Sequence, residues 1–143
     1  MAQPYVNANY ATAKRVTDVG DLPDHAVMQA LVTAGALVAL ADGRVEQVER
    51  DELTSFITRQ GFVAGKSSED IGAAFDDRVR DLSERFSPDT IVDAMRPLAG
   101  RSLTSIIVRT AERVAAADRE IHPGEQQAIK LIRLTMMTLR ANP

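Results

Sequence analysis

The sequence contains no cysteine and no tryptophan, and only 4% of its residues are aromatic. The absence of cysteine excludes a disulfide scaffold, a thiolate zinc site, an iron–sulfur cluster and a cysteine nucleophile. The scarcity of aromatic residues argues against an all-β sandwich or barrel, because such folds rely on β-branched and aromatic side chains. The core must therefore be built from Leu, Ile, Val, Ala and Met.

The chain also lacks an excess of positive charge and a long apolar run. Its formal net charge is −3, which disfavours a nucleic-acid partner, because phosphate binding needs a surplus of Lys and Arg. Residues 1–20 contain no apolar segment of the kind found in signal peptides. The most apolar stretch, residues 26–41, is shorter than the roughly 20 residues that span a bilayer. We therefore expect a cytoplasmic protein without direct membrane insertion.

What the sequence does contain is a series of helical patterns. No stretch alternates with period two, and apolar residues recur at helical spacing throughout. With 143 residues, the chain is long enough for one domain. We predict an N-terminal arm over residues 1–20 and a single all-α domain over residues 21–143, a bundle of about six helices. The expected helix starts are Asp21 as N-cap, Gln47, Ser67 or Ser68, Ser87, Ser102 and Pro123.

The third of these helices has the clearest amphipathic pattern. Apolar residues recur at steps of four, four, three and four, which predicts one buried face. The opposite face carries Asp76–Arg80 and Asp81–Arg85 at i,i+4 spacing, which predicts two solvent-exposed ion pairs. The predicted buried face consists of Ile71, Phe75, Val79, Leu82 and Phe86.

Two segments of the chain match at an offset of 76 residues. Residues 31–56 align with residues 107–132, and each copy reads as a helix, a turn of the form A-D-x-x-[VI]-x-x-x-E, and a second helix. Matched helical hairpins predict two halves that pack around a pseudo-twofold axis. On that basis the two turns should share a backbone path and lie near each other.

The repeated turn resembles a known family. The segments Ala41–Glu49 and Ala117–Glu125 are similar to the paired motif of TerB-type tellurite-resistance proteins, a domain also found in DnaJ-like membrane co-chaperones. The resemblance extends over about residues 24–139. It implies an all-helical domain, a cytoplasmic bacterial role in tellurite resistance or stress response, and a divalent-cation site.

The same turns can be tested against the chemistry of hard cations. The pattern D-G-x-[VI]-x-x-x-E matches the second half of a calcium-binding EF-hand loop. In the first copy, however, the opening ligand positions of such a loop fall on Val38 and Leu40, which offer no oxygen ligand. In the second copy, Arg119 replaces the glycine of the sharp turn. The sequence therefore argues against a complete EF-hand.

A cation could instead bind at a single site that the two turns form together. Two half-loops facing each other would pool four carboxylates, and calcium or magnesium accepts such oxygen ligands. A competing interpretation needs no metal: Glu49 and Glu125 stand where a capping-box glutamate would bond the N-cap amide, and an Asp after a helix can satisfy turn amides. The candidate metal ligands are Asp42, Glu49, Asp118 and Glu125.

No enzyme motif withstands inspection. The segment Gly61–Ser67 is one residue short of a phosphate-binding P-loop and follows a helix rather than a strand. The two histidines, His25 and His122, have no histidine or thiolate partners at metal-ligand spacing. Two hypotheses remain: a TerB-like stress-response protein that binds calcium or magnesium, and a metal-free helical module that binds protein partners. A homodimer is compatible with both.

Overall fold

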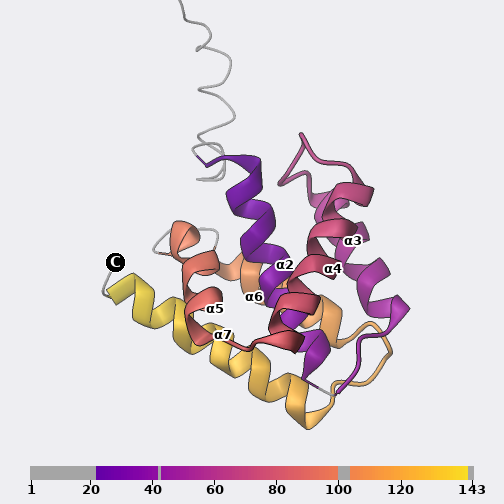
Figure 1. Ribbon diagram of the computed structural model, residues 1–143, viewed down its shortest axis with the longest axis vertical. Coiled ribbons are helices and arrows are strands. Elements are labelled where there is room, and N and C mark those ends of the chain that lie inside the picture. Colours follow the sequence, from indigo (N-terminus) through magenta and orange to yellow (C-terminus); the bar gives the residue numbers. More distant parts are fainter. Residues whose placement is uncertain (1–21, 42, 100–103, 142–143) are drawn as a thin grey trace, which may run out of the picture.

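The computed structural model describes residues 22–41, 43–99 and 104–141 of the chain. Within them it contains six α-helices, one short 3₁₀-helix and no strand, which confirms the predicted all-α bundle (Figure 1). The predicted arm over residues 1–20 lies outside the described residues. The helices are α2 (Asp24–Leu40), α3 (Gln47–Gln60), α4 (Ser68–Glu84), α5 (Pro88–Met95), η2 (Arg96–Leu98), α6 (Thr104–Ala115) and α7 (Pro123–Ala141).

Helix α2 is the central element of the bundle. It packs against α4, α5, α6 and α7, and Figure 1 shows it passing through the middle of the molecule. Every residue from Ala30 to Ala39 is buried, as expected for a helix that is apolar nearly all round. Small residues allow the close packing: a Cβ atom at Gly35 would lie 2.8 Å from Cδ1 of Leu53 on α3. Burial of each large side chain here stabilises the fold by about 1.5–3 kcal/mol.

Several helix boundaries follow from local chemistry. The Oγ of Ser67 accepts the Asp70 N–H at 3.0 Å, and the Asp70 carboxylate accepts the Ser67 N–H at 3.0 Å, so α4 starts with a complete capping box. Gly61 ends α3 with φ 71°, a left-handed conformation that glycine adopts without steric cost. The predicted N-cap of α2 is wrong: that position is held by Pro23, and Asp21 lies outside the described residues.

The surface of α4 differs from the prediction. Arg80 pairs with Asp77 at 3.1 Å rather than with Asp76. Asp76 instead accepts two hydrogen bonds, at 2.9 and 3.0 Å, from Arg50 on α3. The Arg50 guanidinium lies against Gly72, where a Cβ atom would be 2.6 Å from its Nη2. Neighbouring helices therefore redirect charges that a single-helix pattern pairs locally.

The buried face of α4 is also shorter than predicted. Ile71, Phe75 and Leu82 are buried, and Val79 is half-buried. Phe86 is 58% exposed, because α4 ends at Glu84 and the chain turns before Pro88. None of the helices in the described part of the chain is both long and apolar enough to span a membrane.

Candidate functional site

The α2–α3 loop and the α6–α7 loop, which carry the predicted site, have matching local geometry. The Gly43 N–H donates to the Leu40 carbonyl at 3.0 Å, and the Arg119 N–H donates to the Ala116 carbonyl at 3.0 Å. Gly43 has φ 99° and Arg119 has φ 74°, so both loops use a left-handed residue at equivalent positions. For arginine this conformation costs about 1–2 kcal/mol. The arrangement of the two halves about a pseudo-twofold axis stays a prediction.

The two glutamates of the repeat occupy equivalent places at the starts of α3 and α7. Oε1 of Glu49 accepts the Glu46 N–H at 2.8 Å, and Oε1 of Glu125 accepts the His122 N–H at 2.9 Å. The hydrogen bond expected of a capping-box glutamate is therefore present in both loops. Both side chains are buried, with 1% and 0% of their surface exposed. Their burial was not predicted, since most capping glutamates face solvent.

Asp118 is engaged within its own loop. Its Oδ1 accepts the Glu120 N–H at 3.1 Å, and its Oδ2 lies 3.4 Å from Nε2 of His122. The hydrogen bond from the Glu120 amide, with the His122 contact adding to it, lowers the pKa of Asp118 below its usual value. The hydrogen bond to Asp118 likewise raises the pKa of His122. Asp118 thus satisfies turn amides, as the metal-free interpretation expects.

The two loops lie close together at one end of the bundle. A Cβ atom at Gly124, at the start of α7, would be 2.6 Å from the carbonyl oxygen of Ala41, at the end of α2. This approach is possible only because residue 124 is a glycine. Figure 1 shows the same proximity between the end of α2 and the start of α7.

The described carboxylates do not form a cation site. Three of the four predicted ligands are described, and each uses an oxygen on the backbone of its own loop. Asp42 lies outside the described residues. Among the residues that are placed, no group of three acidic, histidine or cysteine side chains converges to hold a metal ion. The shared cation site stays a prediction.

A comparison with protein families identifies the chain. The family model described as "Tellurite resistance protein TerB" matches residues 28–137, from the second turn of α2 to near the end of α7. The chain belongs to the TerB family. This agrees with the resemblance carried by its two loops, and the family is generally non-enzymatic. Comparisons with curated proteins and with solved structures gave no match.

The TerB-family fold also carries a groove that the sequence did not reveal. It lies where α2 and α4 end and α7 begins, and its volume is about 610 Å³. We call it the α2/α4/α7 groove. The signal that could have found it is the Ser87-Pro88 pair, which stops α4 before Phe86 can join the core. Its lining consists of Leu37, Leu40, Ala41, Leu82, Ser83, Phe86, Gly124, Gln127, Ala128 and Leu131.

Exposed apolar side chains continue along α7 from the groove towards the end of the helix. Leu131 is 45% exposed and lines the groove, and Leu134 and Met137 follow it at successive steps of three. The opposite face of α7 packs into the core as predicted, with Ile129, Ile132, Met136 and Leu139 buried. Large apolar side chains that gather on a surface mark an interaction site more often than scattered ones.

Proposed function

We propose that this TerB-family domain is a non-catalytic docking module, which binds an acidic amphipathic helix of a protein partner in the α2/α4/α7 groove. The observation that carries the proposal is the groove itself, an open apolar concavity of about 610 Å³ with Phe86 and Leu131 exposed at its rim. Such grooves between helices receive the apolar face of a partner helix, through anchors spaced i, i+3, i+4 and i+7.

The lining of the groove favours an apolar contact. None of its ten residues carries a charge, and its polar side chains are limited to Ser83 and Gln127. A partner can therefore bury leucine-like side chains there without desolvating an ion. Removing apolar surface from water stabilises a complex by about 25 cal/mol per Å² before the costs of association. Phe86, at the rim of the groove, supplies an aromatic side chain of the kind enriched in such interfaces.

The charge of α7 favours an acidic partner, although Lys130 and Arg133 line a separate pocket against α6 rather than the groove itself. After Glu125, the only charged residues of the chain are Lys130, Arg133 and Arg140. Lys130 and Arg140 are exposed, whereas Arg133 donates to Glu112 on α6 at 2.8 Å. The helix that forms one wall of the groove is thus positively charged, although the whole chain is negative. The net charge of α7 attracts negatively charged partners at long range, and it does not form contacts inside the groove.

The test uses a synthetic helical peptide of about 20 residues, with leucines at i, i+3, i+4 and i+7 and glutamates elsewhere. Fluorescence anisotropy should show binding, and the same peptide with lysines in place of glutamates should bind at least about tenfold more weakly. Phe86→Asp and Leu131→Asp should each reduce affinity at least about tenfold.

Val48→Asp is the matched control, because Val48 is a similarly exposed apolar side chain on α3, outside the groove. It should leave peptide affinity unchanged, and thermal melting should show that all three variants fold. Absence of binding, equal binding of both peptides, or equal loss in the Val48 variant would each refute the proposal. Concentration-dependent dimerisation abolished by Leu131→Asp would instead assign the groove to a second copy of the chain.

The second candidate is the divalent-cation binding predicted from the sequence. The proximity of the two loops, with Gly124 against the Ala41 carbonyl, supports it. The use of Glu49 and Glu125 as caps inside the core weighs against it, because a buried carboxylate that bonds an amide must rearrange to meet an ion. Melting with and without calcium, magnesium and EDTA separates the two functions.

A further inference from the structure

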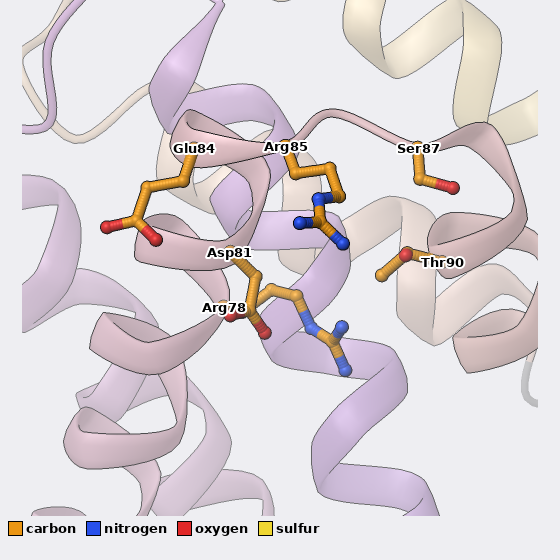
Figure 2. A pocket seen from close by; sticks show the side chains of 6 residues that line it. All are labelled: Arg78, Asp81, Glu84, Arg85, Ser87 and Thr90. Carbon is orange, nitrogen blue, oxygen red and sulfur yellow. The ribbon is translucent and has the colours of Figure 1, made fainter.

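A polar cavity between α4 and α5 has no role in docking at the α2/α4/α7 groove. Its volume is about 490 Å³. Figure 2 shows the guanidinium groups of Arg78 and Arg85 directed into the same space, which Thr90 closes from the side of α5. The lining consists of Arg78, Asp81, Glu84, Arg85, Ser87 and Thr90.

The donors of this cavity have few acceptors within the protein. No other described residue forms a hydrogen bond or ion pair with the Arg85 side chain, although the Arg85 N–H bonds the Asp81 carbonyl. Arg78 is fixed by a hydrogen bond of 2.6 Å from its Nη2 to Gln29 Oε1 on α2, and its Nε is buried without a hydrogen-bond partner. Ser87 stands at the N-cap of α5 but makes no capping bond through its side chain.

We infer that this cavity binds a phosphate group, either free or carried by a small monoester. Two guanidinium groups supply paired donors that match the oxygens of phosphate, and the hydroxyl group of Thr90 can donate a further hydrogen bond. The start of α5 adds the partial positive charge of a helix N-terminus. The cavity is larger than a phosphate ion, so it leaves space for the organic part of an ester.

Two carboxylates lie in the lining, and Asp81 is the one that should weaken binding of such a ligand. The Glu84 side chain points away from both guanidinium groups, as Figure 2 shows. Asp81 lies between the two arginines on α4, three residues after Arg78 and four before Arg85. Its negative charge opposes a bound phosphate. Removing that charge should therefore tighten binding, which is the opposite of the effect of removing either arginine.

The experiment is a titration of the 143-residue chain with inorganic phosphate and with glycerol phosphate. It is followed through the Nε–Hε resonances of the arginines in ¹⁵N-correlated NMR spectra. The Arg78 and Arg85 resonances should shift with one common dissociation constant. The Arg80 resonance is the internal control and should not move, because Arg80 pairs with Asp77 and does not line the cavity. Tighter binding of glycerol phosphate would assign an ester, and equal binding would assign the free ion.

Variants then separate a built site from general attraction of anions. Arg85→Gln should weaken phosphate binding at least about tenfold, whereas Arg80→Gln, which removes the same charge, should leave it within about twofold. Asp81→Asn should strengthen binding by about threefold or more. The inference is overturned if no arginine resonance shifts, if the two arginine variants lose affinity equally, or if Asp81→Asn does not tighten binding.

Discussion

Replacing Glu125 by alanine should destabilise the protein more than replacing a solvent-exposed capping residue by alanine would. The variant removes the acceptor of the His122 N–H, a part-buried hydrogen bond of 2.9 Å. Losing a cap and leaving its amide without an acceptor costs about 1–2 kcal/mol. The side chain is 0% exposed, so the lost methylene adds about 0.8 kcal/mol. The total is about 2–3 kcal/mol of unfolding free energy.

This cost can be measured as a change in melting temperature. For a chain of this size, 1 kcal/mol corresponds to roughly 3 °C, so Glu125→Ala should lower the midpoint by about 6–9 °C. Glu125→Gln keeps an acceptor oxygen and the side-chain volume, and should cost less than about 1 kcal/mol. Glu69→Ala, at an exposed position in the first turn of α4, is the control and should change stability by less than about 0.5 kcal/mol.

The same variants test the cation hypothesis. A ligand at 100 times its dissociation constant stabilises a protein by about 2.7 kcal/mol. If Glu125 ligates calcium or magnesium, Glu125→Gln should lower the melting temperature only when millimolar cation is present. If Glu125 only caps α7, the effects of both variants should be the same with EDTA and with cation. An alanine variant that melts within 1 °C of the wild type, or a Gln variant as unstable as the Ala variant, would refute the capping argument.

Three further predictions concern the α6–α7 loop. Arg119→Gly should raise the unfolding free energy by about 0.5–1 kcal/mol in urea titrations, because glycine relieves the left-handed strain; a loss would contradict this. Gly124→Val should lower it by about 1–3 kcal/mol, since the new side chain meets the Ala41 carbonyl, and a neutral result would show that the loops can separate. Because the pKa of His122 is raised in the folded protein, protonation of His122 stabilises the fold below about pH 6.5, and this stabilisation is lost as the pH rises through the pKa of the folded state. Because the pKa of Asp118 is lowered in the folded protein, the ionised carboxylate stabilises the fold above about pH 4, and this stabilisation is lost as the pH falls through the pKa of the folded state. Melting curves from pH 3 to 9 should therefore show a contribution between those limits that Asp118→Asn removes, and an unchanged profile would argue against the pair.

The helices were predictable because their signals are local. Ser67 with Asp70 forms the cap that starts α4, and Gly61 supplies the positive φ that ends α3. Helix α3 begins at Gln47, as expected from the sequence. These features depend on a few neighbouring residues, so the sequence contains all the information needed to place them.

Ion pairs, side-chain burial and surface hollows that depend on contacts between helices were not predictable from the sequence. Arg50 reaches Asp76 across 26 residues, so the pairing Asp76–Arg80 expected within α4 does not form. Phe86 continues the apolar period of α4 but lies beyond the end of the helix. The burial of Glu49 and Glu125 follows from how α3 and α7 are packed, which a capping motif alone does not indicate. The groove and the polar cavity arise from such packing, and only the Ser87-Pro88 pair, which ends α4 before Phe86, hints at the groove in the sequence.

Because Arg50 lies against Gly72, the residue at position 72 of α4 affects the ion pair that Arg50 of α3 forms with Asp76 of α4. A methyl group at position 72 would meet the end of the Arg50 side chain, which is flexible and can move aside. Moving it would break both hydrogen bonds to Asp76. Gly72→Ala would thus weaken the attachment of α3 to α4 through loss of these hydrogen bonds, and it would not create a packing defect. Gly72→Ala would have no such effect in a variant that already lacks the Arg50 side chain. The loss of unfolding free energy measured for each substitution would therefore depend on which of the two is made first.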